Sequence, residues 1–508
     1  MASNLQAQHD ASVAVISSRV KHFHSLNQAF RVYHGSTHST RPSQHYANNT
    51  VDVSMLTRVL RIDTDKKTAL VEANVPMDQL VRATLKHGLI PPIVMEFPGI
   101  TVGGGFAGTA GESSSFRYST FEHTVSWIKI VLGNGEVVTA SATEREDLFY
   151  GAGSSHGTLG VITLLEVQLV EAKKFVELTY YPVDSLDAAV RKFKEEAGKP
   201  ETMYMDGILF ARDRGLVCIG QLADSVKPGS RIQRFCRAAD PWFYTHAEEL
   251  MGKLHEPVTE AVPLVDYFFR YDRGAFWTGK YAFDQLMVPF NRVTRWILHD
   301  LLHARKMSHA LHSSGLSASN VIQDIGIPYS TAGEFFDFVN EVFPLYPVWL
   351  CPVSIRGASD SPSAPPGPFM HRLTDHSEDD TFLNFGIWGP GPKRRREFVD
   401  LNRALEKKAA DLRGVKVLYA HAYYTEEEFW QIYDKEKYDA LRGKYFAQHL
   451  PTVYDKVKVD LGVGNGEEGE VEDGKGKPSG IKERSGFLAA VYGVAHLLLR
   501  SEYILKKK

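Results

Sequence analysis

Cysteine is scarce in this chain, and its scarcity narrows the class of protein. The 508 residues include three cysteines, Cys218, Cys236 and Cys351, which lie far apart in the sequence. Such a set is too small and too scattered for a disulfide framework or a zinc site. We therefore expect an intracellular protein of a reducing compartment, with no metal site.

A strong charge bias and an apolar leader are also missing. The formal net charge is −3, which gives no general attraction to nucleic acid. Residues 1–20 contain Asp10 and Arg19 and no long apolar run, so neither a signal peptide nor an amino-terminal membrane helix is expected. The length allows two or three domains with hydrophobic cores.

The carboxyl-terminal end has a different composition. Residues 486–499 carry no formal charge and are flanked by basic residues, but fourteen residues are fewer than the roughly 20 that span a bilayer. The segment 485–508 either lies in a membrane interface or docks on the protein as a helix, and the sequence leaves both open. The Gly/Glu/Lys-rich residues 458–484 are predicted to be a disordered linker.

Glycine, in contrast, is concentrated in one segment. Five of the nine residues from Gly103 to Gly111 are glycine. A backbone with so few side chains can bring its N–H groups close to a large phosphorylated ligand. A structural turn is the alternative, but the density of glycine favours a cofactor loop.

Two further loops have similar chemistry. His34–Arg41 follows a strand-like run, and Gly151–Gly160 precedes the predicted strand Val161–Val170. Together the three loops indicate one anion-binding site built largely from backbone groups. Gly464–Gly469 also matches the G-x-G-x-x-G pattern. It follows no clear strand, opens no helix and contains two glutamates, so we exclude it as a dinucleotide site.

Local patterns predict strands and helices along the whole chain. Alternating polarity indicates strands, three-to-four spacing indicates helices, and a Thr425/Glu428 capping box begins one of the helices. Asn134-Gly135 between two apolar runs predicts a hairpin with a tight primed turn. The remaining predicted elements are a strand at 68–74, a helix at 76–87, β-structure at 207–220, and helices at 290–303, 396–412 and 425–441.

In their order and residue sequence, the three loops resemble those of the vanillyl-alcohol-oxidase-type flavoproteins. Within that superfamily, the chain resembles the Δ24-sterol reductase group. The resemblance implies an α+β fold. Its parts are a two-part FAD-binding domain of the vanillyl-alcohol-oxidase (PCMH) type over residues 1–173 and a larger α+β cap or substrate domain over 174–457. The motifs that carry it are 56–72, 101–104, 108–109, 112–115, 147–150, 157–160, 172–174, 241–243, 323–324, 346–352 and 427–430.

The sequence departs from that group in several places. Met95–Ile100 replaces a Leu-Pro-Glu-Leu-Asp-Asp-like approach to the glycine segment, and Tyr267–Arg273 lacks both histidines of a Tyr-Tyr-His-Arg-His-Thr-Arg motif. The group's amino-terminal membrane helix is not seen. The spacing Gly35-x-x-His38-Ser39 looks like the loop that binds flavin covalently in aldonolactone-type oxidases, so His38 is a candidate attachment site.

The resemblance implies FAD as cofactor and leaves three functions open. The first is an NADPH-linked reductase of a carbon–carbon double bond in a sterol or related lipid, cytoplasmic or peripheral on the endoplasmic reticulum membrane. The second is an oxidase or dehydrogenase of an alcohol, and the third a non-catalytic lipid-binding flavoprotein. Intact glycine loops argue against the third. The basic run Lys393–Arg396 is either a site for the NADPH 2′-phosphate or a solvated helix start.

Both enzymatic functions need a proton donor or acceptor beside the reacting atoms. The candidates are Tyr423, His421 and Tyr267, with Arg270 as an electrostatic partner and Asp324 as an orienting residue. Each has an alternative role, in the core, in an internal polar network or, for Asp324, as a helix cap. The predicted flavin contacts are Gly35, Ser36, Thr37, His38, Ser39, Thr101, Val102, Gly103, Gly104, Gly105, Phe106, Ala107, Gly108, Thr109, Ala110, Gly111, Glu112, Ser113, Gly153, Thr158 and Val161.

Overall fold

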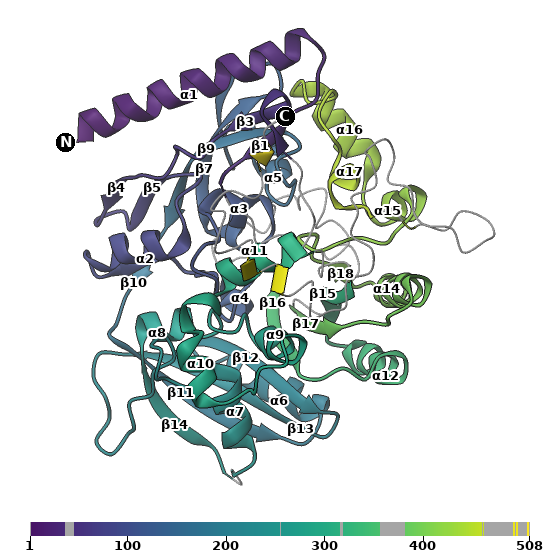
Figure 1. The fold of residues 1–508 in the computed structure, drawn as a ribbon. Helices are drawn as coiled ribbons and strands as arrows, with labels where there is room; N and C mark the ends of the chain where they lie inside the picture. Colours follow the sequence, from purple (N-terminus) through teal and green to yellow (C-terminus); the bar gives the residue numbers. More distant parts are fainter. Residues whose placement is uncertain are drawn as a thin grey trace.

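Two parts, each with its own antiparallel sheet, make up the structure, which is a computed structural model (Figure 1). The purple and blue amino-terminal part lies above the teal and green part. The mixed α+β architecture confirms the predicted fold class. The structure describes residues 2–35, 45–253, 256–314, 319–355, 381–459, 461, 491–492, 494–495 and 505–506.

The amino-terminal part is built on a five-stranded antiparallel sheet with the order β4-β5-β9-β7-β8. Its strands are β4 (Val59–Asp63), β5 (Thr68–Glu72), β7 (Val125–Leu132), β8 (Val137–Ser141) and β9 (Gly160–Gln168). Short pairs add β1 (Arg31–Tyr33) to β3 (Thr50–Asp52), β6 (Leu89–Ile90) to β10 (Val170–Glu171) and β2 (His45–Tyr46) to β19 (Leu505–Lys506). Its helices, apart from the first, are α2 (Met77–Leu85), α3 (Val102–Ala107), α4 (Ser115–Tyr118) and α5 (Glu146–Ala152), with a 3₁₀ turn η2 (Phe121–Thr124).

The first helix, α1 (Ala2–Ser25), lies along the top of this part (Figure 1). It buries Val13, Ile16, Val20 and Phe23, which are three or four residues apart and therefore share one face. His9 Nδ1 lies 3.0 Å from Glu72 Oε1 and ties the helix to β5. Among the described residues, no helix is both long and apolar enough to cross a membrane.

The second part contains an eight-stranded sheet in which every neighbouring pair is antiparallel, with the order β14-β11-β13-β12-β16-β17-β15-β18. Its strands are β11 (Phe175–Val183), β12 (Thr202–Ala211), β13 (Arg214–Ala223), β14 (Val258–Pro263), β15 (Asn320–Pro328), β16 (Val348–Ser354), β17 (Thr381–Pro390) and β18 (Val415–Lys416).

The two faces of this sheet pack against different partners. On β13, Val217 and Ile219 join a core with the helices α6 (Leu186–Ala197), α12 (Ala332–Val342) and α14 (Arg395–Asp411). Leu216 and Cys218 point the other way, into the core shared with the amino-terminal part. This alternation follows from the two-residue period of a strand, and it leaves one face of the sheet directed at the amino-terminal part.

Further helices belong to the second part. They are α7 (Phe243–Met251), α8 (Leu264–Phe268), α9 (Thr278–Gln285), α10 (Arg292–Ile297) and α11 (Ala304–Ser314), with a 3₁₀ turn η3 (His299–Leu301). The last helices of the described chain, α15 (Glu426–Ile432), α16 (Lys435–Lys444) and α17 (Val453–Val457), return to the amino-terminal part. Tyr438 Oη on α16 donates a 2.7 Å hydrogen bond to Thr158 Oγ1. The predicted domain boundaries at 173 and 457 stay predictions.

Several predicted elements are confirmed, and others are corrected. The helix predicted at 290–303 is the shorter α10, followed by the 3₁₀ turn η3. The hairpin at Asn134-Gly135 exists, but only Gly135 has a positive φ, so its turn is not of the type I′ class. The capping box at Thr425 begins α15, which ends at Ile432 because Tyr433 is extended and Asp434 caps a new helix. Asp324 lies within β15 and caps no helix. The predicted linker 458–484 and segment 485–508 lie almost wholly outside the described residues.

Candidate active site

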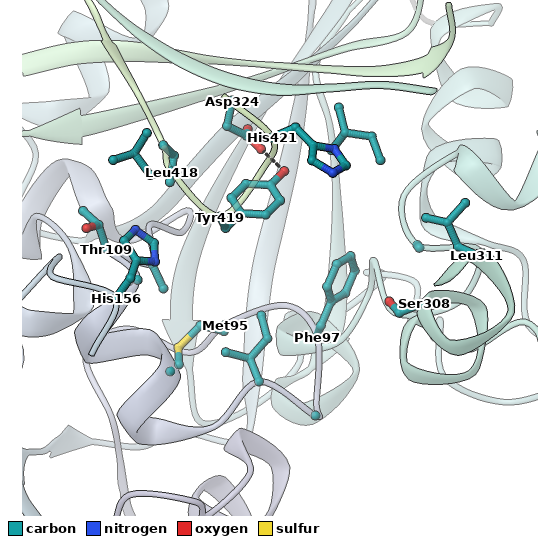
Figure 2. Close-up of a pocket in the computed structure, with 18 of the residues that line it drawn as sticks. Met95, Phe97, Thr109, His156, Ser308, Leu311, Asp324, Leu418, Tyr419 and His421 are labelled. Carbon is teal, nitrogen blue, oxygen red and sulfur yellow. Dashed lines mark hydrogen bonds between the residues drawn. The ribbon is translucent and has the colours of Figure 1, made fainter. Parts of the chain in front are cut away.

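A cavity of about 1160 Å³ lies between the amino-terminal part and the eight-stranded sheet. Figure 2 shows its walls: Thr109 and His156 on one side, Ser308 and Leu311 of α11 opposite, and Asp324, Tyr419 and His421 between them. Ligand pockets are typically about 300–1,000 Å³. This cavity therefore has room for a large cofactor together with a second molecule.

Strand alternation supplies the sheet side of the cavity. On β16, Trp349, Cys351 and Val353 line the cavity, whereas Leu350 is in the core on the far face. The same two-residue period brings cavity-lining side chains from β15 and β17. These are Asn320, Ile322 and Asp324 on β15, and Phe382, Asn384 and Trp388 on β17.

The glycine segment forms the opposite wall, partly as a helix. Thr101 caps α3 by accepting a hydrogen bond from Gly104 N–H at 3.1 Å, so Val102–Ala107 is helical and not the loop that we expected. A Cβ on Gly103 would stand 2.8 Å from Ala73 Cβ. Gly103 is therefore needed for packing on the end of β5, while Gly104, Gly108 and Gly111 also line the cavity.

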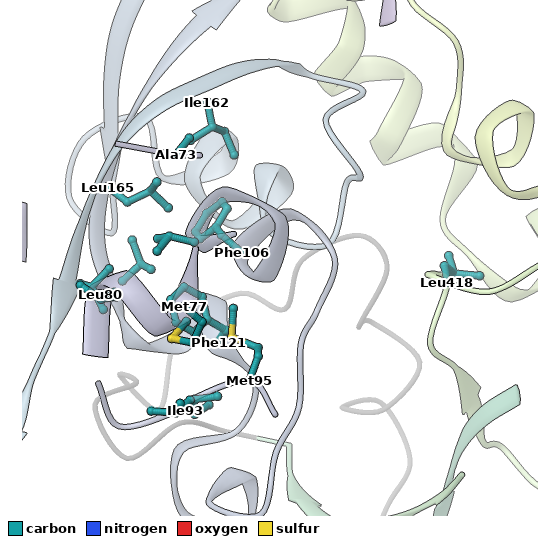
Figure 3. Close-up of a cluster of buried hydrophobic side chains, with 14 of the residues drawn as sticks. Ala73, Met77, Leu80, Ile93, Met95, Phe106, Phe121, Ile162, Leu165 and Leu418 are labelled. Atoms are coloured by element: carbon teal, nitrogen blue, oxygen red, sulfur yellow. The ribbon is translucent and has the colours of Figure 1, made fainter. Parts of the chain in front are cut away.

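A hydrophobic core holds this segment in place from behind (Figure 3). Phe106, Met77 and Phe121 point toward one another there, and Met95 reaches the same cluster. Met95 Cε would lie 2.3 Å from a Cβ on Gly105, so a side chain there would have to displace the end of Met95. The segment thus has one face fixed in the core and one face directed at the cavity.

Most predicted flavin contacts line the cavity or lie next to residues that do. Seven of them do not line it themselves: Gly35, Val102, Gly105, Phe106, Ser113, Gly153 and Thr158. Four lie outside the described residues: Ser36, Thr37, His38 and Ser39. Those that line it are Thr101, Gly103, Gly104, Ala107, Gly108, Thr109, Ala110, Gly111, Glu112 and Val161.

Two predicted catalytic residues, Tyr267 and Arg270, lie behind the cavity wall. The Arg270 guanidinium and Asp206 form a fully buried ion pair at 2.8 Å. Asp206 Oδ2 also accepts hydrogen bonds from Tyr271 Oη at 2.7 Å and from Trp349 Nε1 at 3.1 Å. Tyr267 Oη donates to Ser113 Oγ at 3.2 Å. In this geometry the pair belongs to an internal polar network that orients Trp349; their catalytic role stays a prediction.

Asp324, in contrast, lines the cavity, and its carboxylate accepts three hydrogen bonds. It accepts hydrogen bonds from Asn384 Nδ2 at 2.7 Å, from Trp388 Nε1 at 3.2 Å and from the Tyr419 hydroxyl (Figure 2). Burial raises the pKa of Asp324 to about 6, against the opposing effect of these hydrogen bonds. At neutral pH the carboxylate is therefore mostly ionised and fixes the Tyr419 side chain.

Glu96 is a cavity residue that sequence reasoning missed as a functional group. Burial raises the pKa of Glu96 to about 8, and the nearby Asp324 charge reinforces the shift while Arg270 opposes it. Glu96 is thus mostly protonated at neutral pH, when Asp324 is ionised. Two carboxyl groups with separated pKa values are the usual arrangement for a donor and an acceptor in one site. One signal was present in the sequence: an acidic residue five positions before the Thr101 cap.

The predicted residues His421 and Tyr423 also line the cavity. Both backbones are held by a buried ion pair between Lys416 and Glu406: Lys416 donates to the His421 carbonyl, and Tyr423 N–H donates to Glu406 at 3.0 Å. Burial raises the pKa of Tyr423 above its ordinary range, so its hydroxyl is neutral at physiological pH.

The cavity fits a large nucleotide cofactor that donates hydrogen bonds. Within the described residues, the buried Oδ1 atoms of Asn74 and Asn384 have no hydrogen-bond partner, and both residues line the cavity. An unpaired buried acceptor costs about 1–3 kcal/mol, which a ligand N–H would recover. Beside Gly111 the nearest atom to an added Cβ lies 3.6 Å away, so the wall there is open to a bound group.

Comparison with known proteins agrees with a site for a nucleotide cofactor. Residues 11–141 match the family model described as an FAD binding domain. The Δ24-sterol reductase of Macaca fascicularis is 31% identical over 407 residues, which cover 78% of this chain and 76% of that protein. The Arabidopsis thaliana Δ24-sterol reductase is 30% identical over 425 residues, covering 78% and 74%. Cytokinin dehydrogenase 4 of rice is 28% identical over 155 residues, 30% of this chain and 29% of that enzyme.

These similarities extend well beyond the amino-terminal part. The matched length reaches into the eight-stranded sheet and its helices, so the agreement includes the face of the sheet that lines the cavity. The resemblance inferred from the loops is therefore confirmed, and with it the expected FAD-binding domain at the amino-terminal end. The chain belongs to the Δ24-sterol reductase family of FAD-binding oxidoreductases.

Proposed function

We propose that this protein is an NADPH-linked, FAD-dependent reductase of a carbon–carbon double bond in a sterol or related lipid. One observation carries the proposal: the cavity of about 1160 Å³ has a glycine-rich wall on one side and an apolar helical wall on the other. A nucleotide cofactor fits the first wall and a rigid lipid the second. The names of the relatives, Δ24-sterol reductases, support the same substrate class.

The apolar wall suits a lipid because aliphatic and thioether side chains predominate in it, beside a few uncharged polar residues such as Gln285 and Ser308. Transfer of a lipid into such a wall gains roughly 25 cal/mol for each Å² of apolar surface removed from water. No charged side chain of the described residues interrupts the wall between α9 and α11. Its residues include Leu286, Leu298, Leu301, Leu302, Met307 and Leu311.

The proton is the part of the reaction that the chain itself must supply. Reduction of an alkene adds a hydride to one carbon and a proton to the other; FAD, when bound, supplies the hydride chemistry. Glu96 holds a proton on its carboxyl group at neutral pH and lies in the cavity wall. We assign it as the proton donor, with Asp324 holding the Tyr419 hydroxyl in position. His421 and Tyr423 remain the alternative donors.

NADPH is proposed as the reductant. Arg395, within the basic run Lys393–Arg396, is the member of that run that lines the cavity, which supports a contact with a phosphate group. The scarcity of cysteine supports an intracellular location for the protein.

Anaerobic reduction of the flavin tests the proposal. Purified protein should carry a yellow chromophore, and NADPH should bleach it within seconds to minutes, faster than NADH does. A sterol with a side-chain double bond should then restore the colour under anaerobic conditions. Bleaching by an alcohol alone, with peroxide formed in air, would instead establish the oxidase, which the Gly35-x-x-His38 spacing favours. Protein without flavin would leave a lipid-binding role.

A further inference from the structure

The most exposed apolar side chains of the described second part gather around α10. Val293, Trp296 and Ile297 are 64%, 59% and 63% exposed, and their three-to-four spacing places them on one face of the helix. Met287, just before the helix, is 74% exposed. Single exposed apolar residues need no explanation, but a cluster containing tryptophan indicates an interaction surface. We call these four residues the α10 patch.

The chain that carries the α10 patch also forms a wall of the cavity. Leu286 lies next to Met287, Leu298 follows Ile297, and Leu301 and Leu302 belong to the next turn; all four leucines line the cavity. The segment from α9 to α11 therefore separates the cavity from the surface on which the patch lies. Figure 1 shows α10 and α9 on the near side of the sheet, far from α1 at the top.

Cationic side chains border the patch. Arg292 and Arg295 of α10, together with Arg231 and Lys253, line a small pocket of about 220 Å³. Among the described residues that line this pocket, Glu249 is the one carboxylate, and its charge acts on Arg295. Arg295 is held by cation–π contacts, 4.8 Å from the centre of the Phe290 ring and 5.8 Å from that of Trp242.

We propose that the α10 patch and this basic pocket form a docking surface for an anionic phospholipid bilayer. The apolar side chains enter the interfacial layer, where tryptophan is favoured, while the arginines and Lys253 bind headgroup phosphates. The wall from α9 to α11 then faces the membrane and admits the lipid substrate to the cavity. This last step rests on the proposed function, whereas the docking itself does not.

Charge favours a bilayer over a second copy of the chain. In a twofold dimer through α10, the same surface of each copy would meet, which brings the cationic residues of one copy close to those of the other. Like charges at such an interface oppose association. An anionic lipid surface satisfies the cations and the apolar residues together.

Vesicle flotation of the full-length protein tests the docking surface. Wild type should float with vesicles of phosphatidylcholine and phosphatidylserine and much less with phosphatidylcholine alone, and high salt should release it. The Trp296→Asp/Ile297→Asp variant should bind at least tenfold more weakly. Arg292→Glu should weaken binding by fivefold or more, since each basic residue near an anionic surface contributes about fivefold. The matched control is Val15→Asp/Leu26→Asp, which should bind like wild type. Val15, in the middle of α1, is 63% exposed, and Leu26, just after α1, is 57% exposed.

Three results would overturn the inference. The first is that wild type does not bind vesicles. The second is that the Trp296→Asp/Ile297→Asp variant binds vesicles within twofold of wild type. The third is that this variant changes from dimer to monomer while its vesicle binding stays intact. The second would assign membrane contact to another segment, such as 485–508. The rate of flavin bleaching by NADPH, measured without vesicles, separates the two proposals. It should be the same in both proteins, and its absence in both would count against the proposed function alone.

Discussion

At the scale of single residues, burial decides the chemistry of the site. Glu96 and Asp324 are both carboxylic acids in the cavity wall, yet the pKa of Glu96 is raised to about 8 and that of Asp324 to about 6. The difference arises because three donors stabilise the Asp324 carboxylate. One residue is therefore a proton donor near neutrality and the other an acceptor.

The Glu96→Gln variant tests the proton donor. Glutamine keeps the shape but carries no transferable acid proton, so we expect lipid reduction to slow by about 10²–10⁴-fold. Bleaching of the flavin by NADPH should stay within a fewfold of wild type. In wild type the reduction rate should fall as pH rises through about 8, because only the protonated carboxyl donates. A variant with wild-type rate, or with the same pH profile, would assign the proton to another residue.

The same carboxyl predicts a stability trend. The pKa of the Glu96 carboxyl is higher in the folded than in the unfolded chain. Its contribution to the free energy of unfolding is therefore complete below about pH 4.3 and is lost as the pH rises to about 8. Glutamine does not ionise, so the Glu96→Gln variant lacks this loss of stability at higher pH. The melting temperature of the cofactor-free variant minus that of the wild type should therefore increase from pH 5 to pH 8 and level off above that. A difference that does not depend on pH would contradict the raised pKa.

Removal of the buried Asp206 carboxylate should be costly. Asp206→Asn leaves the Arg270 charge buried without its counter-ion, and breaking such pairs typically costs about 3–5 kcal/mol. Chemical denaturation of the variant measures the loss. The control is Asp337→Asn, which removes an exposed ion pair with Arg212 and should leave the free energy of unfolding almost unchanged. Equal effects of the two substitutions would refute the role given to the Arg270 network.

At the scale of elements, strand alternation and a short helix build the cavity. Each of β15, β16 and β17 sends alternate side chains into the cavity and the rest into the core on the far face. Opposite them, α3 holds the glycine segment between the core and the cavity. The glycines of that segment consequently have two different functions, which substitutions can separate.

Gly103→Ala and Gly111→Ala form a matched pair for this purpose. An added Cβ on Gly103 would meet Ala73 Cβ at 2.8 Å, so overpacking should cost about 1–3 kcal/mol of stability with or without flavin. An added Cβ on Gly111 has no neighbour nearer than 3.6 Å, so this change should be neutral or slightly stabilising without flavin and should weaken flavin binding. Thermal unfolding and flavin titration distinguish them. Equal stability of the two variants would contradict the packing role of Gly103.

At the scale of the whole molecule, the two parts meet across the cavity and again through the carboxyl-terminal helices. The eight-stranded sheet closes one side of the cavity, and α16 reaches back to the loop before β9. Tyr438 Oη donates to Thr158 Oγ1 and accepts from Val453 N–H at 3.1 Å. The carboxyl-terminal helices therefore hold a loop that we predicted to contact the flavin.

Tyr438→Phe tests this connection. Loss of the hydroxyl leaves buried partners unpaired, which should lower the free energy of unfolding by about 1–3 kcal/mol. Flavin dissociation should also become faster, because the loop from Gly151 to Gly160 loses its hydrogen bond to α16. Stopped-flow measurement of flavin release, beside thermal unfolding, checks both effects. Unchanged flavin release would limit Tyr438 to a structural role.

The sequence by itself determined the cofactor and the family. Glycine density, three loops in a fixed order and motifs spread over residues 20–457 are properties of the chain that do not depend on how distant residues pack, and the FAD binding domain and the relatives confirm them. It also predicted local elements such as the hairpin at Asn134-Gly135 and the cap at Thr425, because turns and caps depend on neighbouring residues.

Only the tertiary structure decided which polar side chains meet. Glu96, Asp324 and Tyr419 come from three distant segments, and nothing local marks them as partners. Arg270 and Tyr267 were equally prominent in the sequence, yet packing places them behind Trp349 and outside the cavity. The pKa values that separate a proton donor from an acceptor arise from burial, which is a property of the folded chain. For that reason the sequence identified the cofactor, whereas the candidates for acid and base required the fold.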